Sequence, residues 1–161
     1  MQRAAAKLTH SLAARGVRVS YVPATAHAHL AAYRSKSQGG PLIEIFRHAG
    51  APVEPLRELI LLAHEAGHQY SDQHGHRVPG YEIAAARFAA RLDLSGDQIL
   101  AILVEECLAW RLGRVMLELC GATLPEYDAA MRDGLELYRQ SLRVGDDVLV
   151  DVTQWVDEKF A

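Results

Sequence analysis

The sequence has few cysteines, no long apolar stretch and no excess of basic residues. Its two cysteines, Cys107 and Cys120, fall in one expected helix and cannot form the disulfide framework typical of small secreted proteins. No apolar run approaches the roughly 18 residues needed to cross a bilayer, so we expect no membrane span. The formal net charge is −3 and no basic stripe is present, which argues against direct binding of nucleic acid.

The composition is typical of a soluble globular protein. The chain has 161 residues, of which 50% are apolar and 23% charged, so we expect a single domain over residues 1–161. Its N-terminal segment lacks the apolar stretch of a secretory signal, and the expected compartment is the cytoplasm. The histidines are unevenly distributed, because a short stretch contains half of the eight: His64, His68, His74 and His76.

Hydrophobic spacing predicts an α+β fold, with a small antiparallel or mixed N-terminal sheet followed by helices. Turn-forming residues at 35–41 indicate a hairpin between the second and third strands. Ser95 with Gln98, and Thr123 with Glu126, have the form of capping boxes. The expected helices are 3–15, 55–71, 81–92, 96–120, 125–143 and 147–160, and the expected strands are 18–22, 29–33 and 42–46.

Residues 64–68 form an H-E-x-x-H motif on the helix expected to begin at Pro55. Residues four apart lie on one helical face, so His64 and His68 can bind a single metal ion. Two neutral imidazoles and a carboxylate suit zinc and leave a fourth position for water. Glu65 would accept a proton from that water and deliver it to the leaving amine. The motif is expected by chance on the order of 0.03 times in a chain of this composition, and solvated surface histidines are the alternative.

The sequence offers three candidates for the third metal ligand. The first is the pair Glu105 and Glu106, on the apolar side of a long helix, where a carboxylate needs a partner such as zinc or a core-facing arginine. The second is His74, which completes the ligand spacing of the metzincin motif, although Ser71 stands where that motif has glycine. The third is Glu82 in the following helix, for which exposure on the surface is an equal explanation.

The motif and the later glutamate pair resemble the ImmA/IrrE group of small cytosolic zinc metallopeptidases. The segment E-E-C-L-A-W-R at 105–111 is similar to an E-x-x-A-W pattern of related short bacterial and phage proteins, in which the glutamate three before the alanine is the ligand. This resemblance selects Glu106 and covers roughly residues 17–118. The chain departs from the E-x-E-A-N-x-F-A segment of many members, because Ala86 stands where asparagine or aspartate is usual.

The resemblance implies a gluzincin-like peptidase domain. Zinc would be held by His64, His68 and Glu106, with Glu65 as the general base that activates the zinc-bound water. The implied partner is a peptide or protein substrate, and a transcriptional repressor is one protein that such peptidases cleave. Two alternatives stay open: a zinc-binding regulatory module without turnover, closed by His74 or Glu105 as a fourth ligand, and a metzincin-type peptidase that uses His74 as the third ligand.

Several other residues have expected roles around this motif. Asp72 is a candidate to orient a ligand imidazole. His76 and Tyr81 are candidate hydrogen-bond donors to an oxyanion. The strand 42–46 is the candidate to bind the substrate backbone as an added strand at the sheet edge. Trp155, at helical spacing in the last segment, is expected in the core.

Overall fold

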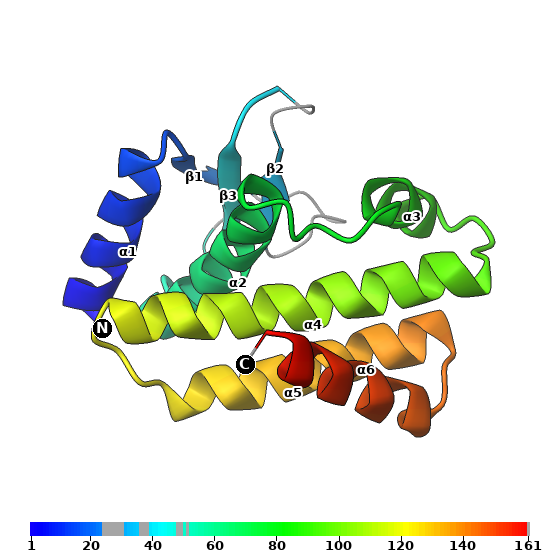
Figure 1. Cartoon of the computed structure of the whole chain (residues 1–161). Coiled ribbons are helices and arrows are strands. Elements are labelled where there is room, and N and C mark those ends of the chain that lie inside the picture. The colour runs from blue at the N-terminus through cyan, green and yellow to red at the C-terminus, as the bar shows by residue number, and fades with distance from the viewer. Residues whose placement is uncertain (24–30, 36–38, 48–49, 51, 161) are drawn as a thin grey trace.

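The computed structural model describes residues 1–23, 31–35, 39–47, 50 and 52–160, and these residues form three strands and six helices (Figure 1). This arrangement confirms the predicted α+β class with a small N-terminal sheet. The elements in chain order are α1 (Gln2–Ala14), β1 (Arg18–Pro23), β2 (Ala31–Arg34), β3 (Leu42–Arg47), α2 (Pro55–Gln73), α3 (Tyr81–Ala89), α4 (Gly96–Leu119), α5 (Pro125–Leu142) and α6 (Asp146–Lys159).

The sheet is mixed and has the order β1-β3-β2. β2 and β3 form the predicted antiparallel hairpin, and β1 runs parallel to β3 along its whole length. The expectation that residues 42–46 form an edge strand is wrong, because β1 occupies the side of β3 that the hairpin leaves open. The buried side chains of Ile43 and Ile45 agree with this central position. The first two residues of the strand predicted at 29–33 lie outside the described residues.

The helix boundaries follow the local signals at most termini. The capping box that begins α4 is formed as predicted, with the Gln98 N–H donating to Ser95 Oγ (3.3 Å) and the Ser95 N–H donating to Gln98 Oε1 (3.0 Å). The second capping box is not formed. α5 starts with Pro125 at its first position, so the N-cap is Leu124, without a side-chain hydrogen bond. Thr123 therefore lies one residue too early to cap the helix.

α2 and α4 cross in close contact because glycines stand where the two backbones meet. A Cβ on Gly67 would lie 1.9 Å from the carbonyl oxygen of Ala109, and one on Gly113 would lie 2.4 Å from that of Ala63. No larger residue fits either place without moving a backbone. Figure 1 shows α2 running across α4 below the sheet. This crossing brings the H-E-x-x-H segment of α2 against the middle of α4.

α5 and α6 lie on the side of α4 away from the sheet (Figure 1). Tyr127 of α5 is buried, and its hydroxyl donates to the carbonyl oxygen of Trp110 (2.9 Å). The prediction that Trp155 lies in the core is wrong, because its side chain on α6 is 48% exposed. α6 packs against α4 and α5, and its residues Val150 and Trp155 stay exposed. Among the described helices, none has both the length and the apolar character to cross a membrane.

Candidate metal centre

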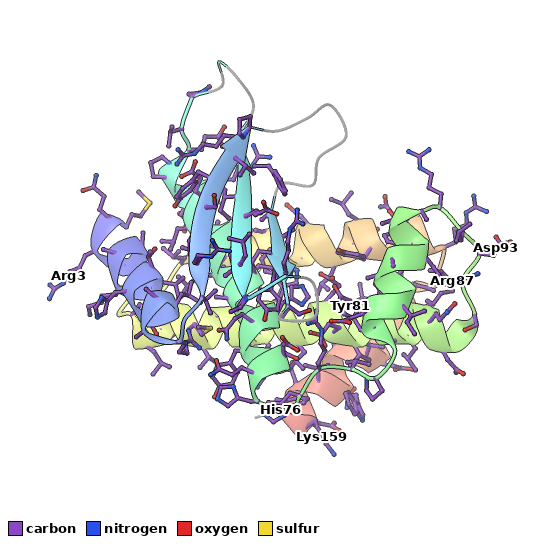
Figure 2. All side chains as sticks on the ribbon, turned by 90° about the horizontal axis from the view of Figure 1, so that it is seen from above. Arg3, His76, Tyr81, Arg87, Asp93 and Lys159 are labelled. Atoms are coloured by element: carbon purple, nitrogen blue, oxygen red, sulfur yellow. The ribbon has the colours of Figure 1, made fainter. Side chains whose placement is uncertain are left out.

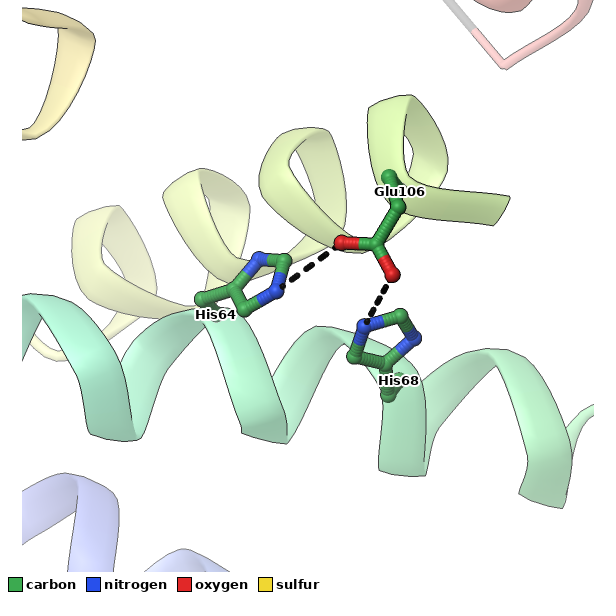
Figure 3. Close-up of side chains that lie close together, drawn as sticks. All are labelled: His64, His68 and Glu106. Atoms are coloured by element: carbon green, nitrogen blue, oxygen red, sulfur yellow. Dashed lines mark ion pairs between the residues drawn. The ribbon is translucent and has the colours of Figure 1, made fainter. Parts of the chain in front are cut away.

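The structure brings His64 and His68 of α2 together with Glu106 of α4 (Figure 3). Each of the three side chains offers one ligand atom, and these atoms all lie within 4.8 Å of one another. All three residues are buried, with 8%, 5% and 2% of their surfaces exposed. Among the described residues, this is the group of histidine and carboxylate side chains that could hold a metal ion.

Each imidazole lies near a different oxygen of the Glu106 carboxylate, at a distance close to the ligand separation of a tetrahedral metal site. His64 Nε2 lies 3.4 Å from Glu106 Oε2, and His68 Nε2 lies 3.6 Å from Glu106 Oε1. With metal–ligand bonds of about 2.0–2.1 Å, neighbouring ligand atoms of a tetrahedral ion lie about 3.3–3.4 Å apart. Glu106 Oε2 is buried and accepts no hydrogen bond from the described residues. A buried carboxylate oxygen that accepts no hydrogen bond is costly, so the donor set fits a bound cation.

Charge within the group is balanced even without a metal. Burial acts to lower the pKa of His68, but the negative charge of Glu106 and a hydrogen bond to Glu105 outweigh it and raise that pKa to about 10. Burial acts to raise the pKa of Glu106, but the two imidazoles hold it well below its usual range. A metal ion bound here would take the place of the proton on His68.

Glu105 binds the side of the His68 ring that faces away from Glu106 and is not part of the ligand group. Its Oε1 accepts a hydrogen bond from His68 Nδ1 (3.2 Å), the ring nitrogen that points away from Glu106. Its Oε2 accepts from the Val78 N–H (3.0 Å) and from Ser71 Oγ (3.4 Å). Because a carboxylate can only accept, this contact places the proton of neutral His68 on Nδ1 and leaves Nε2 free to bind a metal.

The sequence assigned this orienting role to Asp72, and the structure does not support it. Asp72 Oδ2 accepts a hydrogen bond from the Tyr33 hydroxyl (2.8 Å), and its other oxygen lies 3.4 Å from Arg77 Nη1. Asp72 stands one helical turn beyond His68 and points toward β2. A spacing of four residues indicates the same helical face but not the same height along it.

His74, the third ligand of the metzincin alternative, lies outside the group. Its side chain is exposed, its Nδ1 contacts the carbonyl oxygen of Tyr70 (3.0 Å), and its ring stacks on the Tyr70 ring. In place of a sharp turn at Ser71, α2 continues through that residue to Gln73. His74 therefore does not lie on the helical face that carries His64 and His68.

Glu82, the remaining ligand candidate, and His76, a candidate oxyanion donor, also lie outside the ligand group. Glu82, at the start of α3, accepts a hydrogen bond from Ser35 Oγ (3.1 Å) and lies 3.6 Å from Arg77 Nη1. His76 lies on the far side of α4 from the group, where its ring contacts Phe160. His76 is thus not placed to donate to a group bound near the metal ligands.

Two tyrosines approach Glu106 from other elements. The Tyr81 hydroxyl donates to Glu106 Oε1 (3.0 Å), and its ring stacks beside His68, so Tyr81 lies at the ligand group, while its role as an oxyanion donor stays a prediction. Tyr138 of α5 interacts with the same carboxylate. Burial, followed by the charge of Glu106, raises the pKa of both phenols, so both stay protonated donors. Tyr138 was missed because no local pattern links α5 to the motif.

The ligand group lies at one wall of a cleft with a volume of about 550 Å³. Glu65, 7% exposed, also lines this cleft but does not belong to the ligand group. β2 forms one rim, while small and aromatic side chains of α3, among them Phe88, form an apolar wall. The three candidate ligands are thus buried on the core side and reachable from the cleft.

Comparison with models of known protein families, with curated proteins and with solved structures finds no match for this chain.

Proposed function

We propose that this chain is a zinc-dependent peptidase in which His64, His68 and Glu106 hold the metal ion and Glu65 is the general base. One observation carries this proposal: three buried ligands converge beside a cleft, and a further carboxylate lines that cleft without being a ligand. Two imidazoles and one carboxylate are a donor set that zinc favours at catalytic sites. When bound, zinc would lower the pKa of a water in its open position and polarise the substrate carbonyl.

Glu65 is suited to move the proton that hydrolysis requires. Its backbone follows His64 directly on α2, so its side chain is displaced by about 100° around the helix from the metal-facing position. There it accepts a proton from the attacking water and returns it to the amide nitrogen as the carbon–nitrogen bond breaks. Each proton taken from water is thus given to the leaving amine, and the carboxylate is regenerated.

Tyr81 and Tyr138 supply donors for the developing oxyanion. Both phenols line the cleft next to Glu106 and stay protonated at neutral pH. A hydroxyl that points to the place where negative charge develops stabilises the transition state more than the substrate. The substrate carbonyl oxygen is expected between these hydroxyls and the metal ligands, where each phenol would donate its hydrogen bond to the oxyanion in place of Glu106.

β2, rather than the strand 42–46, is suited to bind the substrate backbone as an added strand. It lies at the edge of the sheet, and among the described strands it pairs with β3 alone. All four of its residues line the cleft. An extended substrate can therefore add to β2 through backbone hydrogen bonds, with its scissile bond next to the metal ligands.

A closed, purely structural metal site is less well supported. Such a site has four protein ligands, and Glu105 and His74 were the candidates for the fourth. Glu105 instead binds the outer nitrogen of His68, and His74 contacts Tyr70 at the surface. A metal ion held by the three ligands that line the cleft would then keep a fourth position for water or substrate, as an enzyme requires.

The test combines metal content with hydrolysis of an unfolded, fluorescently labelled casein. We expect about one zinc per chain and measurable cleavage by the wild type. Glu65→Gln should keep the zinc and lose activity by about 10²–10⁴-fold. Glu126→Gln, an exposed site on α5, is the matched control and should behave as the wild type. A zinc-loaded wild type that cleaves no better than Glu65→Gln would reject the peptidase and leave the metal site standing.

A further inference from the structure

A second cavity, of about 600 Å³, lies on the opposite side of α4 from the metal ligands. α4 contributes Leu100, Val104 and Leu108, whose spacing of four residues places them on one helical face. Val104 and Leu108 each stand two residues from Glu106, about 200° around the helix axis. The two cavities therefore use opposite faces of the same helix. We call this second cavity the α4–α6 groove.

The α4–α6 groove is lined by exposed apolar side chains. Leu100 and Trp155 are 47% and 48% exposed, and Phe160 closes the end near His76. Figure 2 shows His76 beside the C-terminal end of α6, near Lys159. A hollow lined by a Trp, a Phe and several aliphatic side chains is suited to receive an apolar group of a ligand.

The rim of the groove is acidic. Asp97 from the first turn of α4 and Asp151 from α6 both line it, and no basic side chain of the described chain forms an ion pair with either. α6 contains five acidic residues and a single lysine. His76, Lys159 and Arg111 lie at the end that Phe160 closes, and Arg111 is paired there with Asp157. Asp97 and Asp151 thus give the rim negative charge over an apolar floor.

From this combination we propose that the α4–α6 groove is a docking site for a segment of a partner protein in which a bulky apolar residue is flanked by lysine or arginine. The apolar side chain would fill the hollow between α4 and α6. The flanking cations would be attracted by Asp97 and Asp151 and by the ring face of Trp155. The same carboxylates repel phosphate groups, which disfavours nucleic acids and anionic lipid surfaces as occupants.

This inference is independent of the proposed peptidase activity, and the two tryptophans separate the tests. Trp155 lies in the groove, whereas the buried Trp110 ring lies 4.2 Å from the His64 ring at the metal centre. Their two indole N–H signals in a ¹⁵N-correlated NMR spectrum therefore report on different sites. Zinc should shift the Trp110 signal, and a ligand in the groove should shift the Trp155 signal.

The probe is the capped hexapeptide Ac-Ala-Lys-Leu-Phe-Lys-Ala-NH₂. Titrated into the wild-type protein, it should shift the Trp155 signal in a saturable manner. The same peptide with both lysines replaced by glutamate, and a second with Leu-Phe replaced by Ser-Ser, should shift it far less. No shift at millimolar peptide, or equal binding of the glutamate version, would overturn the proposal.

Matched variants locate the binding. Asp151→Asn should weaken the lysine peptide about two- to fivefold, as expected for one partly exposed charge pair. Asp133→Asn removes the same charge from an exposed position on α5 and should leave binding unchanged. Leu100→Lys, a change at an exposed site, should reduce binding more strongly because it fills and charges the groove. Equal affinities for Asp151→Asn and Asp133→Asn would show that the groove is not the binding site.

Discussion

Glu105→Gln tests how α4 prepares His68 for metal binding. In the wild type the fully buried carboxylate accepts three hydrogen bonds, from His68 Nδ1, Ser71 Oγ and the Val78 N–H. Glutamine has nearly the same shape but replaces one acceptor oxygen by an NH₂ donor. Whichever way the amide is placed, at least one of these donors then faces another donor.

Both placements of the amide weaken the metal site. If the NH₂ faces His68, the ring must move its proton to Nε2, which is the nitrogen that faces Glu106 and would bind the metal. If the NH₂ faces Val78, the buried N–H loses its acceptor and the segment after α2 loosens. Loss of such an orienting partner typically weakens metal affinity about 10–100-fold. That range corresponds to about 1.4–2.7 kcal/mol.

The measurement is zinc affinity, by competition with a chromophoric chelator. Glu118→Gln is the control on the same helix, because Glu118 is exposed and pairs only with Arg114 in the described structure. Glu106→Gln removes a ligand and should lose more affinity than Glu105→Gln. A zinc affinity for Glu105→Gln within twofold of the wild type would refute the orienting role. A loss as large as that of Glu106→Gln would refute it too, because Glu105 would then be a ligand.

Three further outcomes follow from the fold. Gly67→Ala places a Cβ 1.9 Å from the Ala109 carbonyl oxygen, so it should lower the free energy of unfolding by at least about 1–3 kcal/mol and weaken zinc binding. Gly96→Ala, with open space around it, should change neither quantity. Urea unfolding compares the stability of the two variants. Ser95→Ala removes a formed capping box and should cost about 1 kcal/mol in the same assay, while Thr123→Ala, outside the helix that it was expected to cap, should cost little. Zinc at 100 times its Kd should raise the free energy of unfolding by about 2.7 kcal/mol, seen as a higher Tm that a chelator reverses, and an unchanged Tm would argue against binding to the folded state.

Local signals in the sequence were sufficient for most elements and for two of the three members of the ligand group. His64 and His68 are four residues apart on one helix, so their proximity depends on helical geometry alone. Local signals did not predict the strand order, because β1 pairs with β3, which is not adjacent to it in the sequence, and no local pattern encodes that pairing. Trp155 was misplaced for a similar reason: helical spacing identifies an apolar face but not whether another element covers it.

The choice between Glu105 and Glu106 depends on how α4 is rotated about its own axis. Adjacent residues point about 100° apart on a helix, so a rotation of that size would exchange the two carboxylates. The rotation is set where α2 and α4 touch, at Gly67 against Ala109 and at Gly113 against Ala63. Both contacts require the glycine side of one helix to face the backbone of the other. Because Ala109 lies three residues after Glu106, docking it onto Gly67 turns Glu106 toward the histidine face of α2 and leaves Glu105 to hold the outer nitrogen of His68.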